Sequence, residues 1–594
     1  MPKHQKLPKK GKKKAGKPVR KEQRARKFAA KPAKFGKKTE AKKDGKAKKK
    51  QHRRPEQPTL PVQDRQIKPV PPATVSALSA PAAPIRVPLV AVIDVGSTAI
   101  RMMIAQPADD GEFHILESLQ HPVRLGKDTF TKGRIEGPTI EESVRILKGF
   151  KQTLAEYGVP AEEVRAVATS SVREAINRDT FLDRVYIATG IQVEAIEEAE
   201  ESRLTCLAAR HLLPDKSSWD HGHAMIVEVG GGNTDLLLLH DGHVSFSNMY
   251  RLGSLRMRET LEASKVPVDR QRKLLEQHIR TNVDVIRRSV PIAQVDTLIA
   301  VSGDMRFASS RLKTDPDPSG FFTLTPKAFN SFAEKLALVP VEELVRREHL
   351  TYQEAETIGP ALMTYRQIAK AFSVKSILVS PTSMREGLLQ EMAARGAWSR
   401  DFAEQAIHSA LSLGVKYQFD ERHARHVADL SIKLFRFLRE EHRLGQRYEA
   451  LLHLAALLHD LGMFVSSRQH HKHSMYLILN SDLFGLTIID KILISLVARY
   501  HRRATPSAEH QEYAVLTRDN RMAVAKLASI LRVADALDRN HLQNAREVEL
   551  RREDGQLSIG IPDLEDLTLE RQAIKEKGSM FEEVYGLKVV LRRA

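Results

Sequence analysis

The sequence is poor in cysteine and in long apolar runs. Its 594 residues include one cysteine, Cys206, so an intrachain disulfide framework is excluded and a buried, inert thiol is expected. No segment reaches the roughly 18 consecutive apolar residues of a membrane span, and lysines occupy the N-terminus where a signal peptide has an apolar stretch. The sequence therefore predicts a cytoplasmic protein with no membrane partner.

Acidic residues are scarce at the start of the chain. Residues 1–54 carry 25 Lys and Arg against 3 Asp and Glu, so this segment accounts for the whole formal charge of +20. The rest of the chain is close to neutral, and its charge identifies no partner. Together with the Pro- and Ala-rich residues 55–88, the segment predicts a disordered tail. Such a tail fits contact with a polyanion through counterion release, and equally a non-specific solubilising arm.

Two stretches of the chain open with the same pattern of strand, glycine-rich turn and strand. The first has predicted strands at 89–93 and 101–106, and the second at 224–229 and 236–239. Helical segments and further short strands follow each of them. This recurrence predicts an internal duplication with a cleft between the two halves.

The chain changes character after about residue 400. Residues 402–541 are almost wholly helical and rich in histidine, and 547–594 alternate like short strands around one helix. The predicted fold class is α/β for the two duplicated domains, followed by an all-α domain and a small α+β domain. The predicted boundaries are a tail at 1–88, duplicated domains at 89–212 and 213–398, the helical domain at 399–545 and the C-terminal domain at 546–594.

Both glycine-rich turns carry groups suited to phosphate. In the segment 94–98 (Asp-Val-Gly-Ser-Thr) a strand delivers a carboxylate, glycine leaves room, and hydroxyl and N–H groups can donate to phosphate oxygens. A single segment of this kind also suits an ordinary hairpin turn. The segment 228–235 (Glu-Val-Gly-Gly-Gly-Asn-Thr-Asp) adds three consecutive glycines, which a purely structural hairpin does not need. Together the two loops predict a clamp around a phosphate chain.

Five motifs, taken in order, resemble those of a known family. They are the segment 94–97, Thr-Ser-Ser-Val-Arg-Glu-Ala at 169–175, Glu-Glu-Ser-Arg-Leu at 200–204, the triple-glycine loop, and Met-Arg-Glu-Gly-Leu-Leu at 384–389. The set is similar to the exopolyphosphatase and guanosine pentaphosphate phosphohydrolase (Ppx/GppA) family of the actin-like superfamily, from about Leu89 onwards. The resemblance implies two duplicated actin-like (ribonuclease H-like) domains, a magnesium ion in the cleft and a homodimer.

The resemblance also implies roles for individual residues. The glutamate that activates the attacking water in this family corresponds to Glu201, and a carboxylate there can take the proton of that water. Arg101 and Arg173 match arginines that neutralise the transferred phosphoryl group. The predicted substrate-binding residues are Asp94, Gly96, Ser97, Thr98, Arg101, Arg173, Glu228, Gly230, Gly231, Gly232, Asn233, Thr234 and Asp235.

The second loop departs from the family pattern. It usually starts with Asp and ends with Ser-Thr-Glu, whereas this chain has Glu228 at the start and Asp235 at the end. Exchanging Asp and Glu at the two positions preserves the charge, but it moves each carboxylate oxygen by about the length of one methylene group. Misplacements of about 1 Å can reduce reaction rates roughly 100-fold. The departure therefore bears on rate and substrate.

The histidine-rich domain resembles the HD metal-dependent phosphohydrolase superfamily. His423, the adjacent pair His459 and Asp460, and Asp535 follow the order of that superfamily's metal ligands, each motif on its own predicted helix. The resemblance suggests His473 and His501 as ligands of a second metal. Neutral imidazoles and carboxylates suit Mn, Fe, Zn or Mg. His453, His470 and His471 are interpreted as packing or solvent-exposed residues.

The sequence leaves several functions open. The leading hypothesis, slightly favoured by the histidine-rich domain, is an exopolyphosphatase that releases terminal phosphate from polyphosphate by metal-assisted attack of water. Guanosine pentaphosphate is the alternative substrate, because it presents a terminal phosphoanhydride to the same clamp. A second hypothesis makes the HD domain the main phosphohydrolase, with a core that senses phosphate. A third is a sensor of polyphosphate or of a guanosine alarmone that does not turn over.

Overall fold

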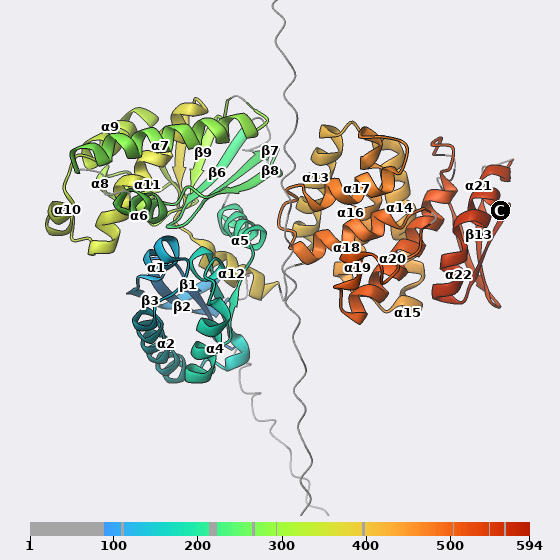
Figure 1. Ribbon diagram of the computed structural model, residues 1–594, viewed down its shortest axis with the longest axis horizontal. Coiled ribbons are helices and arrows are strands. Elements are labelled where there is room, and N and C mark those ends of the chain that lie inside the picture. Colours follow the sequence, from blue (N-terminus) through green and yellow to red (C-terminus); the bar gives the residue numbers. More distant parts are fainter. Residues whose placement is uncertain are drawn as a thin grey trace, which may run out of the picture. The chain divides into compact units, whose positions relative to one another are not determined.

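The computed structural model describes residues 88–593 apart from 109–111, 213–222, 264–267, 293, 395–397, 503, 544, 546 and 563–565. The predicted disordered tail lies, except for Pro88, outside these residues. Figure 1 shows the helices and strands in sequence colours. None of the described helices has a stretch long and apolar enough to span a bilayer.

The first sheet is built around a hairpin of buried, β-branched and apolar residues. Its strands lie in the order β3-β2-β1-β4-β5, antiparallel from β3 to β1 and parallel from β1 to β5. Alternate side chains of β1 enter different cores, because successive residues of a strand face opposite sides. The strands are β1 (Val90–Val95), β2 (Ala99–Pro107), β3 (Phe113–Pro122), β4 (Val164–Ala168) and β5 (Val193–Ala195).

Five helices belong to this part of the chain. The longest of them is the amphipathic helix α2, which ends at the left-handed Gly158. Acidic residues occupy the first turn of α5, where they complement the helix dipole. The helices are α1 (Leu125–Lys132), α2 (Gly137–Tyr157), α3 (Ser170–Arg173), α4 (Arg178–Thr189) and α5 (Glu198–His211).

The second sheet repeats this pattern of pairing. Its order is β10-β11-β9-β6-β7-β8, with β8, β7 and β6 antiparallel and β6, β9 and β11 parallel. The predicted strands at 224–229 and 236–239 are confirmed within β6 and β7. The strands are β6 (His223–Val229), β7 (Thr234–His240), β8 (His243–Tyr250), β9 (Thr297–Ala300), β10 (Phe322–Leu324) and β11 (Ser376–Val379).

The helices after β8 enclose a core of their own with this sheet. Side chains from β6, β7, β9, α7 and α11 meet in it, including Tyr365, whose hydroxyl donates to the Val227 carbonyl oxygen. These helices are α6 (Ser254–Ala263), α7 (Val268–Ser289), α8 (Gly303–Arg311), α9 (Pro326–Leu336), α10 (Val341–Glu348) and α11 (Tyr352–Ala371).

Helix α12 (Met384–Ala393) returns to the first sheet. Its Met384, Leu388 and Leu389 share a core with Val90 and Val92 of β1. The predicted second domain, 213–398, therefore ends with a helix that packs against the sheet of the first domain. The close approach depends on Gly387, because a Cβ there would overlap the Leu204 carbonyl oxygen of α5.

We expect Gly387→Ala to lower the free energy of unfolding by about 1–3 kcal/mol, because the new methyl group must push α12 away from α5. The measurement is the midpoint of denaturant unfolding. Gly149→Ala is the control, since Gly149 is exposed in α2 with open space around it. Alanine there should raise stability by about 0.5–1 kcal/mol through helix propensity. An unchanged midpoint for Gly387→Ala would contradict the packing of α12.

The predicted all-α region is a helical bundle. Its apolar faces enclose one large core to which α13, α14, α16, α18 and α20 contribute. The helices are α13 (Arg400–Lys416), α14 (Glu421–Phe437), α15 (Arg439–His442), α16 (Gln446–Leu458), α17 (His470–Leu479), α18 (Ile488–Arg499), α19 (Gln511–Ala514) and α20 (Arg518–Leu537).

The C-terminal segment has the predicted mixture of short strands and helices, in the sheet order β12-β13-β14. Leu557, Ile559 and Phe581 belong to the same core as the bundle, so the predicted boundary at 546 does not separate two cores. The elements are β12 (Glu549–Glu553), β13 (Gln556–Ile561), α21 (Thr568–Lys577), α22 (Ser579–Tyr585) and β14 (Lys588–Arg593).

Candidate active site

The two glycine-rich loops meet at one cavity of about 440 Å³. The first loop joins β1 to β2 and the second joins β6 to β7, so both are hairpin turns as the sequence predicts. Ser97 Oγ of the first loop lies 3.5 Å from Ser170 Oγ at the start of α3. Three segments far apart in the sequence thus present hydroxyl or backbone donors to one space.

The glycines of the second loop are needed for close packing. A Cβ at Gly232 would overlap Ser170 Oγ and the Phe130 ring, and a Cβ at Gly231 would lie 3.0 Å from Ser97 Cβ. Neither glycine has a positive φ. Their role in the structure is therefore to let the two loops approach each other, in addition to the room for phosphate that the sequence predicts.

Glu201 lines the cavity from the first turn of α5. Arg173 Nη1 donates to Glu201 Oε2 at 2.8 Å and to the Ile196 carbonyl oxygen at 2.8 Å, so the arginine fixes the carboxylate to the backbone. Burial raises the pKa of Glu201, and the Arg173 charge opposes that rise. The ion pair therefore holds the Glu201 carboxylate in one orientation at the cavity.

The exchanged carboxylates Glu228 and Asp235 face each other across the β6–β7 hairpin. Thr205 Oγ1 donates to Glu228 Oε2 at 2.6 Å, and Ser202 Oγ donates to Asp235 Oδ1 at 2.7 Å. Burial raises the pKa of Glu228 to about 7 and the pKa of Asp235 well above its usual value, with Glu201 adding repulsion to both. A buried cation would relieve this repulsion.

The cavity gathers most of the residues predicted for substrate. Arg173 and Thr234 do not line it: Arg173 holds Glu201 instead of facing the cavity, and the Thr234 hydroxyl donates to the Leu252 carbonyl oxygen. The predicted residues that line it are Asp94, Gly96, Ser97, Thr98, Arg101, Glu201, Glu228, Gly230, Gly231, Gly232, Asn233 and Asp235.

Arginines supply the positive charge around the cavity. Arg101 pairs with Asp94 at 3.4 Å across the β1–β2 hairpin. Arg306 donates to the carbonyl oxygens of Ser380 and Thr382 and so holds the loop before α12. Arg385 also lines the cavity, and among the described residues it forms no ion pair. Arg385 is therefore a cation available to an anion in the cavity, whereas Arg173, for which the sequence predicts such a role, is paired with Glu201.

Comparison with known families agrees with this geometry. Residues 103–395 match the model of the Ppx/GppA phosphatase family, and residues 407–576 match the model of Ppx/GppA phosphatase, domain III. Together the two matches cover well over half of the chain. The chain belongs to the Ppx/GppA phosphatase family. It is therefore a hydrolase acting on phosphoanhydride bonds, and the family is generally dependent on divalent metal.

Curated relatives in this family share about a quarter of the residues. A guanosine-5'-triphosphate,3'-diphosphate pyrophosphatase from Photobacterium profundum is 24% identical over 454 residues, which cover 75% of this chain and 86% of the relative. A protein of the same name from Aeromonas hydrophila is 24% identical over 466 residues, covering 75% and 87%. A solved Ppx/GppA structure from Aquifex aeolicus covers 52% of this chain and 98% of its own, with 25% identity and a TM-score of 0.43.

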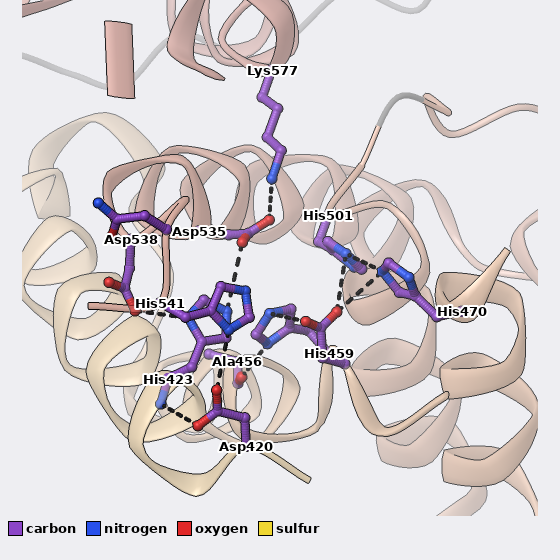
Figure 2. A network of polar contacts seen from close by, with 12 residues as sticks. Asp420, His423, Ala456, His459, His470, His501, Asp535, Asp538, His541 and Lys577 are labelled. Carbon is purple, nitrogen blue, oxygen red and sulfur yellow. Dashed lines mark hydrogen bonds and ion pairs between the residues drawn. The ribbon is translucent and has the colours of Figure 1, made fainter. Parts of the chain in front are cut away.

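The part of this Ppx/GppA chain that matches domain III contains a second cluster of polar residues (Figure 2). The ligand atoms of His423, His459 and Asp535 lie within 4.8 Å of one another. His423 Nδ1 donates to Asp538 Oδ2 at 2.7 Å, and His459 Nδ1 donates to the Ala456 carbonyl oxygen at 2.7 Å. Both rings therefore turn Nε2 towards the centre of the cluster.

Two further groups lie beside this one, and one of them consists of His423, Asp460 and His541. The ligand atoms of Asp460, His470 and His501 also lie within 4.8 Å of one another. The sequence offered His473 as a ligand from α17. In the structure His470 lies in the group instead, and His473 belongs to no such group among the described residues. His470 is the first residue of α17 and is buried, whereas His473 is only half-buried. His470, interpreted from the sequence as a packing or solvent-exposed residue, is buried and lies with Asp460 and His501 in one such group.

Several site residues were missed by reasoning from the sequence. Ser170 and Arg385 lie inside motifs that identified the family, yet no role was assigned to them. Ser202 and Thr205 follow Glu201 on α5, and their spacing of three residues was a usable sign that both face one side. Lys577, which pairs with Asp535 from α21, carries no sequence signal because it lies outside every motif.

Proposed function

We propose that the cleft releases the terminal phosphate of guanosine pentaphosphate by attack of water. The observation that carries this proposal is the convergence of Glu201 with both glycine-rich loops on one cavity. Water attacks the terminal phosphorus, the bond to the bridging oxygen breaks, and the products are inorganic phosphate and the shortened nucleotide. Positioning and charge stabilisation account for most catalysis of this reaction class.

Each residue has a defined part in this reaction. Glu201 takes the proton of the attacking water, and Arg173 is a positioning residue that holds its carboxylate. The hydroxyls of Ser97 and Ser170 and the backbone of the loops hold the phosphate oxygens. Arg385 and Arg101 neutralise charge on the transferred phosphoryl group.

The carboxylates of the cleft fit a divalent metal ion such as Mg²⁺. Asp235 Oδ2 is buried and accepts no hydrogen bond within the described structure, and Glu228 carries a pKa raised to about 7. Asp94, Glu228 and Asp235 are oxygen donors of the kind that Mg²⁺ prefers. When bound, the ion supplies positive charge to the phosphoanhydride oxygens.

The walls of the cavity favour a nucleotide over a bare phosphate chain. Phe307 of α8, Leu350 just before α11, and Ile358 of α11 line the same cavity as the loops and offer apolar surface to a base. The curated relatives carry names that specify the guanosine substrate. The sequence favoured polyphosphate slightly, and polyphosphate remains the second candidate because it presents the same terminal group. The homodimer, the cytoplasmic location, the HD assignment and the polyanion contact of the tail stay predictions.

Phosphate release with Mg²⁺ from guanosine pentaphosphate and from polyphosphate, measured side by side, tests the substrate. We expect the larger kcat/KM with guanosine pentaphosphate. Phe307→Ala should raise KM for guanosine pentaphosphate about ten-fold, because base stacking on an aromatic ring contributes roughly 1–3 kcal/mol. The KM for polyphosphate in the same variant is the control and should not change. A larger kcat/KM with polyphosphate, or an equal loss with both substrates, would refute the nucleotide assignment.

A further inference from the structure

Asp304 is a carboxylate of the glycine-loop cavity that has no part in the hydrolysis described above. It lies in the first turn of α8 and lines the cavity together with Phe307, which follows it by three residues. Residues three apart on a helix are neighbours, with Cβ atoms about 5–6 Å from each other. The Asp304 carboxylate therefore lies beside the ring that offers a stacking surface to a base.

The Asp304 carboxylate has few partners within the protein. Ser302 Oγ accepts from the Asp304 backbone N–H at 3.1 Å and donates to Asp304 Oδ2 at 3.4 Å. Among the described residues this long contact is the only hydrogen bond of the Asp304 side chain, and Oδ1 accepts none. Burial raises the pKa of Asp304 to about 6, so the group is ionised at neutral pH. The carboxylate can therefore accept further hydrogen bonds from a ligand in the cavity.

Glu354 of α11 lines the same cavity but is engaged by the fold. Its Oε1 accepts from Gln120 Nε2 at 3.3 Å. Its Oε2 accepts from the backbone N–H and from the hydroxyl of Thr351, at 2.9 Å each, and so completes the capping box at the start of α11. Both oxygens of Glu354 thus have donors within the protein, unlike those of Asp304.

The surroundings of Asp304 favour a neutral hydrogen-bond donor over an anion or a metal ion. An ionised carboxylate repels a phosphate group. A hard cation takes several oxygen ligands, and Asp304 belongs to none of the groups of metal-ligating side chains found in the described part of the chain. A ligand group with N–H donors and no negative charge meets both conditions.

On the basis of the guanosine substrate proposed above, we infer that Asp304 selects guanine by accepting hydrogen bonds from its N1–H and its 2-amino group while the base stacks on Phe307. These two donors lie side by side on one edge of the base and match the two oxygens of a carboxylate. Hypoxanthine lacks the amino group, and adenine has an acceptor at N1. The same carboxylate repels the successive phosphates of polyphosphate, so Asp304 also acts against the competing substrate.

Phosphate release with Mg²⁺ from guanosine pentaphosphate, from its inosine counterpart and from polyphosphate tests this role. In the unaltered protein we expect kcat/KM to be about ten-fold higher with the guanosine compound, because the inosine compound lacks one hydrogen bond to a charged group. Asp304→Asn should raise KM for guanosine pentaphosphate about 10- to 100-fold with little change in kcat, because the amide offers one acceptor where the carboxylate offers two. The preference for guanosine over inosine should disappear in this variant, and kcat/KM for polyphosphate should not fall.

Glu354→Gln is the matched control, because it removes a negative charge from the same cavity and glutamine can still complete a capping box. This variant should keep the preference for guanosine over inosine. The comparison of the two nucleotides in the unaltered protein needs no substitution, so it decides the matter even where a variant does not fold.

Equal kcat/KM for the two nucleotides in the unaltered protein would overturn the role of Asp304 while leaving the proposed reaction intact. No phosphate release from either nucleotide would refute the proposed function together with it. An equal loss with polyphosphate in Asp304→Asn, or the same loss of preference in Glu354→Gln, would also overturn the role, because the substitution would then act through the fold or through charge alone.

Discussion

Glu201→Gln is expected to lower kcat for phosphate release about 100- to 10,000-fold, because glutamine cannot take the proton of the attacking water. KM should change little, since Glu201 contacts Arg173 and not the loops that hold phosphate. The amide keeps the shape of the side chain and removes a buried carboxyl whose pKa is raised, so the fold should be preserved. The measurement is steady-state release of inorganic phosphate with Mg²⁺ present.

Glu198→Gln is the matched control for this experiment. Glu198 lies in the same first turn of α5, is exposed, and approaches Arg173 only at 3.9 Å. It should retain nearly full activity. Full retention of activity in Glu201→Gln would show that the cleft does not carry out the reaction, and would favour the second hypothesis, in which the histidine-rich bundle is the hydrolytic centre.

Glu228→Asp and Asp235→Glu are each expected to lower kcat/KM about 100-fold, because either change moves a carboxylate oxygen by about one methylene. The two residues face each other across the hairpin, and each accepts a hydrogen bond from α5. One long and one short side chain together span the space. The double variant restores that combination in the reverse order, which is the order usual in the family.

The double variant should therefore recover at least about ten-fold over either single variant, as expected for residues that are coupled directly. Phosphate release is measured for the unaltered protein, the two single variants and the double variant, and the comparison gives the coupling free energy between the two residues. Additive losses in the double variant would show that Ser202 and Thr205 can donate to the two carboxylates only when Glu stands at 228 and Asp at 235. In that case the two substitutions do not compensate for each other.

The positions of the site residues could be predicted where local sequence determines them. The two hairpin loops follow from glycine between buried strands, and Glu201 follows from the order of the motifs. The return of α12 to β1 could not be predicted, because it depends on the fit of Gly387 against Leu204. The tight contact between Gly232 and Ser170 likewise arises only when the two halves meet.

The histidine cluster also depends on a feature that the sequence does not predict, in this case the start of one helix. Of the residues that the sequence offered as ligands, His423, His459, Asp460, His501 and Asp535 lie in these groups, whereas the member from α17 is His470 and not His473. That helix begins after Gln469, which has a left-handed φ of 60°, and the direction of its first turn brings His470 to the centre. Neither the conformation of Gln469 nor the approach of Lys577 has a signal in the spacing of residues.

Helix α5 carries Glu201, Ser202 and Thr205 within little more than one turn. The proton acceptor and both donors to the cleft carboxylates therefore belong to one rigid element. The apolar wall of the cavity comes from other elements, with Phe307 on α8 and Ile358 on α11. The residues that would contact the base and those that would carry out hydrolysis therefore lie on different helices. Substitutions on α8 and α11 can change the substrate range while the hydrolytic groups of α5 stay as they are.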